Sequence, residues 1–410
     1  MKDESLMATQ GEFVMAPKSL DNILVIAPKV PRPDMNSGDL RLFSILGILA
    51  RGHEISFVTT GNRPGDDAYI RRLEQRGITV HAEPFSLRSL LESKRFKIAI
   101  MEFFFTAEYY LDRLRFLQPD CRVIVDSVDV HYLRLRLKYD LTKNATDHAA
   151  YLETKERELS VYRKADGVIA VTGDDAAAIL SEVPDMQVEL VPNIHEVCLG
   201  PIPAERNTLI FVGGFSHPPN VDAVLFFCGE VLPLITHVMP GIRVLIVGSD
   251  PPEQIRKLEN AHIRVTGFVQ ETMPYLHQST VSVAPLRYGA GMKGKIGEAM
   301  AHGVPVVTTS VGAQGMPLIN RKNIMIADTP HDFAASILEL LLDNQLYETL
   351  RNNAVRVIQE NYTHERVART MGGVLERINA KPARRMTLFH KLSFLQGYVT
   401  GRIKTRLSPC

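Results

Sequence analysis

Short runs of β-branched and aliphatic residues alternate with longer stretches of helical spacing along most of the chain. In the first half these runs are NILVIAP, EISFVTT, ITVHAEP, KIAIMEF, CRVIVDSVD and DGVIAVT. Short strands that alternate with helices are typical of a parallel, doubly wound sheet. The pattern therefore predicts a βαβαβ arrangement, with Asp174 as the N-cap of the helix after the last of these runs.

The same alternation restarts after a proline-rich stretch. PNIHEVCLGPIPAERN (residues 192–207) holds three prolines and a glycine between two strand-like runs, which is typical of an interdomain linker. TLIFVGG, IRVLIVG, IRVTGFV, TVSVAPL, PVVTTS and NIMIADT then predict a second parallel sheet. The expected organisation is a mobile leader (1–20), an N-terminal Rossmann-like domain (21–195), a linker (196–207), a C-terminal Rossmann-like domain (208–378) and a tail (379–410).

Length and composition agree with two globular domains. The 410 residues exceed one ordinary core, and 45% hydrophobic and 23% charged residues with a net charge of +1 give no reason to expect nucleic acid as a partner. The four cysteines show no CxxC spacing, so we expect neither a zinc site nor a disulfide framework, and a reducing cytoplasm fits best. Apolar runs such as Ile98–Phe105 are far shorter than the ~20 residues that cross a bilayer, so no transmembrane helix is predicted.

The loop after the first strand lacks the glycine pattern of dinucleotide-binding proteins. NILVIAP is followed by KVPRPDMNSGDLR instead of GxGxxG, which disfavours a dinucleotide oxidoreductase. Ser37 and Gly38 come just before a predicted helix and can present backbone amides to an anion. The alternative is that Gly38 only permits a turn.

The most informative segment is APLRYGAGMKGKIGEAMAHGVPVVTTSVGAQG, residues 284–315. Its glycines let the backbone approach a ligand just where a helix begins, and that helix directs its positive end at any phosphate there. Lys293 and Lys295 add two positive charges, and Glu298 lies one turn beyond Lys295. A diphosphate near the lysines and a ribose near the carboxylate match this spacing. The alternative is a Lys–Glu pair on the surface of an ordinary amphipathic helix.

At this point the sequence resembles the large retaining glycosyltransferase family four, from Asn22 to about Ile378. The motifs that carry the resemblance are SGDLRLFSILGILARGHEISFVTT, VDSVDVHYLRLR, VPN, FVGGFSHPPNVDA, IVGSDP, VTGFVQ and KIGEAMAHGVPVVTT. The resemblance implies a GT-B fold, in which two Rossmann-like domains face each other across a cleft. It also implies transfer of a sugar from a nucleotide-diphosphate donor with retention of configuration and without a metal or other cofactor. The acceptor it implies is a glycan or a lipid-linked glycan, in cytoplasmic assembly of a bacterial surface polysaccharide.

Two departures from the family pattern affect the site. The usual pair of glutamates eight positions apart keeps only its second member, Glu298, because Ala290 stands at the first position. FVGG is followed by FSHPPN, so the usual Arg and Lys after this loop are absent. The sequence is instead similar to a subgroup with Gly-x-Lys-x-Lys before the second glutamate. The donor-binding positions that the resemblance implies are Gly38, Asp39, Gly213, Gly214, Val269, Gly291, Met292, Lys293, Lys295 and Glu298, with Lys295 also catalytic.

His131 is the second catalytic candidate. It follows Asp126 and Asp129 at the end of the VIVDSVDV strand, where the family often has a histidine near the transferred sugar. A lone histidine is also often structural. Two other functions stay open: a nucleotide-sugar 2-epimerase, and a non-catalytic scaffold that binds a nucleotide sugar, which Ala290 favours.

The last 34 residues differ in charge from the rest of the chain. From Arg377 to Cys410 there are eight Lys and Arg residues and no acidic residue. Leu388, Leu392 and Leu395 recur at helical spacing, which predicts a basic amphipathic helix that can lie on an anionic membrane. The alternative is that this helix packs back on the N-terminal domain.

Overall fold

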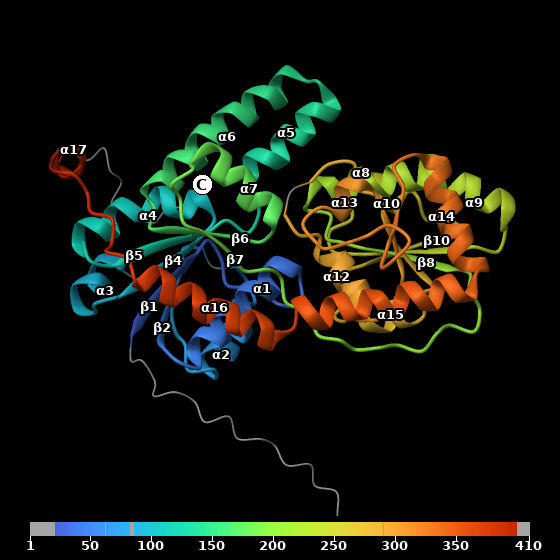
Figure 1. Cartoon of the computed structure of the whole chain (residues 1–410), viewed down its shortest axis with the longest axis horizontal. Helices are drawn as coiled ribbons and strands as arrows, with labels where there is room; N and C mark the ends of the chain where they lie inside the picture. The colour runs from blue at the N-terminus through green and yellow to red at the C-terminus, as the bar shows by residue number, and fades with distance from the viewer. Residues whose placement is uncertain (1–20, 62, 83–85, 290, 400–410) are drawn as a thin grey trace, which may run out of the picture.

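The computed structural model describes residues 21–61, 63–82, 86–289 and 291–399, and the side chains as far as residue 396. The predicted leader (1–20), Ala290 and the end of the tail (400–410) lie outside the described residues. The chain forms two α/β domains that lie side by side (Figure 1). Each domain holds a sheet whose strands all run parallel, as the alternation of strands and helices predicts.

The N-terminal sheet has the strand order β3-β2-β1-β4-β5-β6-β7. Successive strands are added on one side of β1 as far as β3 and on its other side from β4 onward. Its strands are β1 (Asn22–Ala27), β2 (Glu54–Thr59), β3 (Thr79–His81), β4 (Ile98–Glu102), β5 (Arg122–Asp126), β6 (Gly167–Ala170) and β7 (Val188–Leu190). Its helices are α1 (Ser37–Ala50), α2 (Asp66–Glu74), α3 (Leu87–Ser93), α4 (Phe104–Leu117), α5 (His131–Thr142), α6 (Ala145–Lys164) and α7 (Gly173–Glu182). A switch point such as that between β1 and β4 opens the carboxyl edge of a sheet to ligands.

Helix α7 begins two residues earlier than its charged residues suggest. The side chain of Thr172 accepts a hydrogen bond from the amide of Asp175, at 3.0 Å, and is the N-cap. The prediction of Asp174 as N-cap is therefore wrong, and Asp174 lies in the first turn, where its charge still complements the helix dipole.

The C-terminal sheet has the order β10-β9-β8-β11-β12-β13. Its strands are β8 (Thr208–Val212), β9 (Arg243–Val247), β10 (Ile263–Gly267), β11 (Val281–Ala284), β12 (Val306–Thr308) and β13 (Met325–Ile326). The later helices are α8 (Pro218–Phe226), the π-helix η1 (Phe227–Val231), α9 (Leu232–Val238), α10 (Glu253–Arg256), α11 (Met273–His277), α12 (Gly294–Ala301), α13 (Ser310–Ala313), α14 (Pro330–Leu342), α15 (Asn344–Asn361), α16 (His364–Asn379) and α17 (Leu388–Val399).

Helix α16 returns to the N-terminal domain (Figure 1). Val367, Met371 and Ile378 pack in the same buried cluster as the strands of the N-terminal sheet. A Cβ on Gly167 of β6 would lie 2.4 Å from the side chain of Ile378, so this glycine admits the helix. The expected domain boundary at residue 378 follows the chain, whereas the packing assigns α16 to the N-terminal domain.

The stretch Pro218–Val238 is long and apolar enough, by length and composition, to cross a membrane. The sequence predicted no transmembrane helix because its uninterrupted apolar runs are short, and Pro233 and several polar residues interrupt this stretch. Phe226, Phe227 and Ile235 pack in the core of the C-terminal domain, together with strands β8, β9 and β11. The apolar composition therefore serves a core helix.

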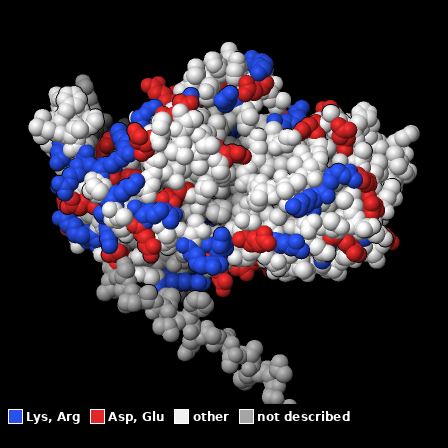
Figure 2. Space-filling view, viewed as in Figure 1, with Lys and Arg blue, Asp and Glu red and all other residues white. Residues whose placement is uncertain are grey.

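The tail reaches the N-terminal domain before it forms α17. The amide of Arg384 and the guanidinium of Arg385 bond Asp166 and Asp120, and the Phe394 ring lies 5.3 Å from that of Phe116 in α4. A cavity of about 600 Å³ lies beside this contact and is lined by Leu111, Asp112, Arg115, Arg163, Lys164, Arg384, Arg385, Met386, Thr387, His390, Ser393 and Phe394. Figure 2 shows Lys and Arg gathered next to α17, while elsewhere on that face both charges are interspersed.

Candidate functional site

The candidate donor site lies where strands β8 and β11 end and helix α12 begins. Gly213 and Gly214 follow β8, and the loop after β11 leads through Gly291 into α12. This helix starts at Gly294, with Lys293 in the N-cap position. The first amides of a helix have no intrahelical partner and carry a partial positive charge, so they favour an anion. The fold thus brings the two predicted glycine-containing segments to one edge of the C-terminal sheet.

Lys295 joins these two segments. Its ammonium donates a hydrogen bond to the side-chain oxygen of Asn220 and lies 4.7 Å from the centre of the Phe211 ring. The amide group of Asn220 in turn donates to the carbonyl oxygen of Gly214 at 2.7 Å. Burial and the neighbouring charge of Lys293 lower the pKa of Lys295 to about 7. A partly desolvated ammonium of this kind is stabilised when an anion binds beside it.

Lys293 is turned away from the glycine loop. Its ammonium donates to the carbonyl oxygen of Gly291, at 2.8 Å, within its own loop. Burial lowers its pKa to about 8, although the carboxylates of Asp175 and Asp129 in the opposite domain oppose the shift. Lys293 therefore shapes the loop, and Lys295 is the lysine that reaches across to the glycine loop.

Glu298 lies one turn further along α12. Its carboxylate accepts a hydrogen bond from the hydroxyl of Thr272, which comes just before α11. Burial raises the pKa of Glu298, while the Thr272 hydrogen bond and the charge of Lys295 act in the opposite direction. The carboxylate is half-buried, and it keeps acceptor capacity beyond the bond to Thr272.

Three of the predicted donor-binding positions also serve the protein's own packing. The amide of Gly213 donates to the carbonyl oxygen of Val247 at 2.9 Å, so that amide is used between the loops after β8 and β9. The side chain of Met292 is buried in the core of the C-terminal domain, and Val269 packs against the same cluster. The side chains of Met292 and Val269 belong to this core, so these two residues can contact a sugar donor only through backbone atoms.

The glycines of the lysine segment have a second purpose, which is contact between the domains. Gly291 has φ +69°, and a Cβ there would lie 3.0 Å from that of Asp129 in the N-terminal domain. A Cβ on Gly294 would lie 2.4 Å from that of Ser37 at the start of α1. Close approach of a ligand is therefore not needed to explain Gly294, because Ser37 already occupies that space.

The start of α1 faces this segment but is largely self-satisfied. The amide of Asp39 donates to the side chain of Asn36 at 2.9 Å. The Asp39 carboxylate lies 3.3 Å from the Lys29 ammonium and accepts from the amide of Arg32 at 3.0 Å. Gly38 lies beside Val128 of the loop after β5. The predicted role of Asp39 in donor binding stays a prediction, and its carboxylate has partners within its own domain.

His131 is the first residue of α5 and lies in an aromatic pocket. Its ring makes edge contacts with Phe103, Phe104 and Phe105, with centroids 5.6, 5.3 and 6.0 Å away. Its Nδ1 atom lies 3.3 Å from a carboxylate oxygen of Asp129, and burial lowers the pKa of the imidazole. A histidine held neutral at a strand's carboxyl end can exchange hydrogen bonds with a sugar hydroxyl.

Helix α5 has a buried carboxylate as its cap. The two oxygens of Glu158, a residue of α6, accept from the amides of His131 and Tyr132 at 3.2 and 3.0 Å, and the Tyr162 hydroxyl donates to it at 2.6 Å. Burial raises the pKa of Glu158 to about 7. This contact fixes the position of His131 and has no signal in the local sequence.

Glu102 ends strand β4 at the same edge and is 5% exposed. Burial raises its pKa to about 8, and the nearby charges of Asp126 and Asp39 act in the same direction. Asp126, at the end of β5, instead pairs with the buried guanidinium of Arg41 at 2.6 Å. At this edge the Glu102 carboxyl therefore favours its neutral form, while Asp126 has a guanidinium partner within hydrogen-bond distance.

Two residues at this edge have backbone conformations that side chains disfavour. Phe103, directly after Glu102, has φ +64°, and Val128 has φ +59°. Such conformations cost about 1–3 kcal/mol each and gather at functional sites. The Phe103 ring contacts that of His131, and Val128 precedes His131 by three residues. The strained conformations therefore mark this edge as a candidate site independently of any motif.

His217 and Arg134 lie between the two edges. Burial, followed by the positive charges of Arg134 and Lys295, lowers the pKa of His217 to about 4. His217 is nevertheless exposed, so the surrounding residues remove only part of its hydration. Arg134 pairs with Asp129 at 3.0 Å. Positive charge from both domains therefore converges near Lys295.

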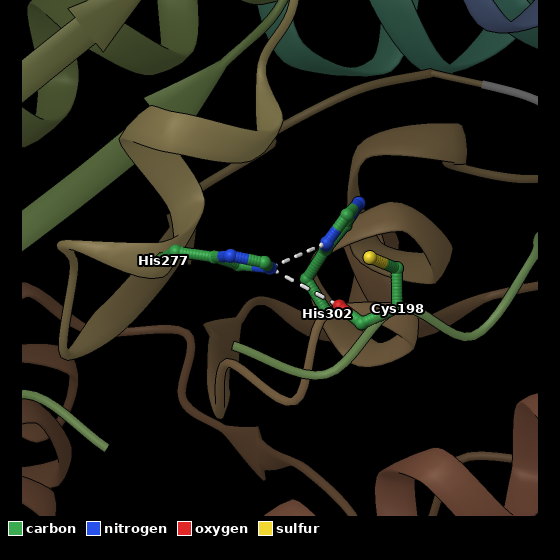
Figure 3. Close-up of side chains that lie close together, drawn as sticks. All are labelled: Cys198, His277 and His302. Carbon is green, nitrogen blue, oxygen red and sulfur yellow. Dashed lines mark hydrogen bonds between the residues drawn. The ribbon is translucent and has the colours of Figure 1, made fainter. Parts of the chain in front are cut away.

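One group of metal-ligating side chains occurs within the described ranges, away from this interface. Cys198, His277 and His302 place one ligand atom each within 4.8 Å of one another (Figure 3). Their sequence separation hides the group, which is why the cysteine spacing did not predict it.

Comparison with known proteins agrees with this architecture. Residues 206–343 match the family described as glycosyl transferases group 1. An uncharacterized 44.6 kDa protein in the cps region of Klebsiella pneumoniae is 25% identical over 186 residues, which cover 43% of this chain and 48% of that protein. The matched region thus spans about half the length of the curated relative.

Solved structures extend the similarity to most of the chain. Alr3699/HepE of Anabaena in complex with UDP and glucose has a TM-score of 0.66 at 14% identity, over 87% of this chain and 99% of that one. Sucrose-phosphate synthase of Thermosynechococcus elongatus has a TM-score of 0.68 at 17% identity, over 88% and 99%. At these identities the similarity establishes the fold, which is GT-B, as the sequence predicts. The family match covers part of the C-terminal domain.

The structure gathers most of the predicted residues at two facing edges. Gly213, Gly214, Gly291, Lys293, Lys295 and Glu298 lie on the C-terminal side, and Gly38, Asp39 and His131 lie on the N-terminal side. Sequence reasoning missed Asn220, His217, Glu102, Glu158 and Thr272. The carboxyl ends of strands were the available signal for Glu102, since it interrupts the apolar run of β4.

Proposed function

We propose that this chain is a glycosyltransferase that moves a sugar from a nucleotide-diphosphate donor to a glycan or glycolipid acceptor, with retention of configuration and without a metal ion. The observation that carries the proposal is the bridge from Lys295 through Asn220 to the carbonyl oxygen of Gly214. It unites a cation, a helix start and a glycine loop at one sheet edge. The match of residues 206–343 to group 1 glycosyl transferases supports the same reading.

The diphosphate binds at the start of α12 in this proposal. A sugar that leaves a diphosphate builds negative charge on the phosphate oxygens and positive charge on the anomeric carbon. Lys295, the first amides of α12 and the amide of Gly214 stabilise the phosphate charge. The loss of one such hydrogen-bond donor typically raises the activation barrier by about 2.7–4 kcal/mol. Because the lysine ammonium supplies the positive charge that a metal cation would otherwise supply, a divalent metal is not needed at this position.

Glu298 binds the ribose hydroxyls of the nucleoside. It lies on the same helix, one turn beyond Lys295, and Thr272 orients its carboxylate. A carboxylate with one acceptor lone pair used can still accept from two vicinal hydroxyls. Glu298 therefore contributes to donor binding rather than to the bond-breaking step.

The acceptor binds against the N-terminal edge. His131 and Glu102 are the groups there that can exchange protons or hydrogen bonds with sugar hydroxyls. In a same-face attack the departing phosphate oxygen takes the proton of the acceptor hydroxyl, so neither residue acts as a nucleophile. The paired carboxylates of retaining hydrolases are not needed for this route.

A donor panel followed by an acceptor panel tests the proposal. UDP-, GDP-, dTDP- and ADP-sugars are first compared by thermal shift, because a ligand at 100 times its Kd stabilises the fold by about 2.7 kcal/mol. Transfer with the anomer preserved, read by NMR, is the expected result. A C2 epimer of the donor sugar would identify the 2-epimerase alternative. Donor binding without transfer or hydrolysis would identify the scaffold alternative.

The tail supports a second part of the proposal, which is attachment to an anionic membrane surface. In α17 the side chains of Leu388, Phe389 and Leu392 are 74%, 77% and 58% exposed, although the preceding residues dock on the N-terminal domain. Arg384 and Arg385 precede these residues closely in the chain, so apolar and basic groups occur together as in interfacial helices. A lipid-linked acceptor would be found at such a surface.

Sedimentation with vesicles tests this part. The triple variant Leu388→Ser, Phe389→Ser, Leu392→Ser should lose binding to phosphatidylglycerol vesicles and keep the Tm of the parent chain. The matched control replaces three exposed aliphatic residues elsewhere, Val238, Ile319 and Leu342, with serine. Equal vesicle binding by the α17 variant and the parent would refute the membrane role.

A further inference from the structure

Three side chains from separate segments meet on the C-terminal domain. Cys198 belongs to the interdomain linker, His277 is the last residue of α11, and His302 is the C-cap of α12. Nε2 of His277 lies 3.0 Å from Nδ1 of His302 and 3.1 Å from the carbonyl oxygen of Cys198. Figure 3 shows the two imidazole nitrogens directed at each other, with the thiol beside them.

Backbone contacts hold this group in place. The amide of Cys198 donates to the carbonyl oxygen of Ala301 at 3.0 Å, and the amide of Gly200 donates to that of His302 at 3.2 Å. A Cβ on Gly200 would lie 2.4 Å from the imidazole of His277, so only glycine leaves room for this ring. The linker is therefore fitted to the two histidines and does not merely pass them.

The ligand atoms have the chemistry and spacing of a transition-metal site. A tetrahedral zinc ion at the usual Zn–N and Zn–S bond lengths separates its ligand atoms by about 3.3–3.7 Å. The three atoms here lie within 4.8 Å of one another, so small side-chain rotations bring them to that spacing. Imidazole and thiolate together favour zinc and its neighbours over magnesium, calcium or manganese.

We propose that Cys198, His277 and His302 bind a borderline-soft divalent metal ion such as Zn²⁺. The thioether sulfur of Met273, 3.8 Å from the Cys198 sulfur, or a water molecule completes the coordination. When the metal binds, each neutral imidazole carries its proton on the ring nitrogen that faces away from the ion, and the thiol proton is released to solvent, because the ligand atoms must be deprotonated.

The metal fastens the linker to the donor-binding helix. His302 ends α12, and the eight residues of that helix separate it by about 12 Å from the phosphate-binding start, so the ion takes no part in the transfer. His195, directly before the linker, also touches α12, because a Cβ on Gly297 would lie 2.3 Å from its ring. A metal at Cys198 thus fixes the chain that connects the two domains. The inference does not depend on the proposed function.

Competition with a chromophoric zinc chelator measures the binding. The full chain is kept reduced, stripped with EDTA, desalted and titrated with Zn²⁺. One equivalent should bind, and Cys198→Ser and His277→Ala should each weaken binding at least tenfold. The matched control is His237→Ala, an exposed histidine at the end of α9 that should bind as the parent does. Melting curves of the metal-free variants check that each is folded.

Cobalt gives a second, spectroscopic readout that is independent of the chelator competition. Co²⁺ bound to the parent chain should show a thiolate-to-cobalt charge-transfer band in the near ultraviolet, with the intense visible bands of a four-coordinate ion. The band should vanish in Cys198→Ser and persist in Cys228→Ser. The proposal fails if the parent does not compete with the chelator, if Cys198→Ser binds zinc as tightly as the parent, if His237→Ala weakens binding as much as His277→Ala, or if the cobalt complex lacks the thiolate band.

Discussion

The two sheet edges that face each other carry opposite charge chemistry. The N-terminal edge gathers Glu102 and Asp126 at the ends of β4 and β5 and Asp39 in the first turn of α1, whereas the C-terminal edge gathers Lys293 and Lys295 at the start of α12. Burial raises the pKa of Glu102 to about 8 and lowers that of Lys295 to about 7. Burial therefore favours the neutral form of Glu102 on one edge and of Lys295 on the other.

The difference lies in how each edge is compensated. On the acidic edge, Arg41 and Lys29 already neutralise two of the carboxylates within the domain. On the basic edge, the Lys295 ammonium donates to the neutral side chain of Asn220 and has no salt bridge among the described residues, although the charge of Glu298 lies near it. An incoming anion can therefore still pair with this ammonium. A donor diphosphate matches that need, and neutral sugar hydroxyls match a neutral Glu102. The basic edge is therefore suited to bind an anion, and the acidic edge is suited to exchange hydrogen bonds with a neutral group.

The largest expected effect is on the basic edge. Lys295→Ala should lower kcat/KM for the donor by about 100- to 1000-fold, because one stabilising donor of the leaving group is worth about 2.7–4 kcal/mol. It should also weaken nucleoside diphosphate binding, measured by calorimetry. Lys257→Ala, an exposed lysine paired with Glu253 on α10, is the control. Wild-type diphosphate affinity in Lys295→Ala would remove this residue from the site.

The pH dependence of stability should have opposite signs at the two edges. Because the pKa of Glu102 is raised in the folded chain, its contribution to stability is complete below pH ~4.5 and is lost as the pH rises toward about 8. Glu102→Gln should therefore gain a few kcal/mol of unfolding free energy over the parent by pH 8, at about 1.4 kcal/mol per pKa unit, and nothing at pH 4.

Lys295→Met gives the mirror image. A lowered lysine pKa destabilises the folded chain at and below pH 7, and this penalty disappears as the pH rises toward the ordinary value of 10.5. The variant should be more stable than the parent at pH 6, with the gain shrinking above pH 8. Denaturant titrations at several pH values measure both variants. Parallel pH profiles for the parent and both variants would contradict the idea of two opposed edges.

A smaller effect is expected for the carboxylate on the basic side. Glu298→Gln should raise the KM for the donor by about 10- to 100-fold, since a hydrogen bond to a charged group is worth about 1.5–3 kcal/mol, and should leave the fold intact. Glu339→Gln, an exposed partner of Arg321, is the control. An unchanged donor KM would favour the alternative of a surface Lys–Glu pair.

The smallest effect concerns the contact between the edges. Gly294→Ala should reduce kcat by roughly fivefold, about 1 kcal/mol of overpacking, because its methyl group meets Ser37 across the interface. Adding Ser37→Gly to this variant should restore most of the rate. Gly241→Ala, where a Cβ meets nothing within 4 Å, is the control. If Ser37→Gly does not rescue, the glycine serves the ligand rather than the domain contact.

Local patterns in the sequence predicted the two parallel sheets and the helix that begins within the lysine segment. These features are local, because strand and helix periodicity, prolines and glycines act over a few residues. The position of α16 was not determined in this way. Its apolar face fits either domain by periodicity, and only the open space over β6 at Gly167 decided where it packs.

Within the site, the sequence predicted that both Lys293 and Lys295 bind the donor and that Lys295 is also catalytic, and the packed structure shows that their contacts differ. Their different directions depend on a partner 75 residues away, Asn220, which local spacing cannot show. The raised pKa of Glu102 and the meeting of Cys198 with two histidines have the same origin. Burial and through-space distance are properties of the packed chain, so residue types alone fix which chemistry is available and packing decides which atoms meet.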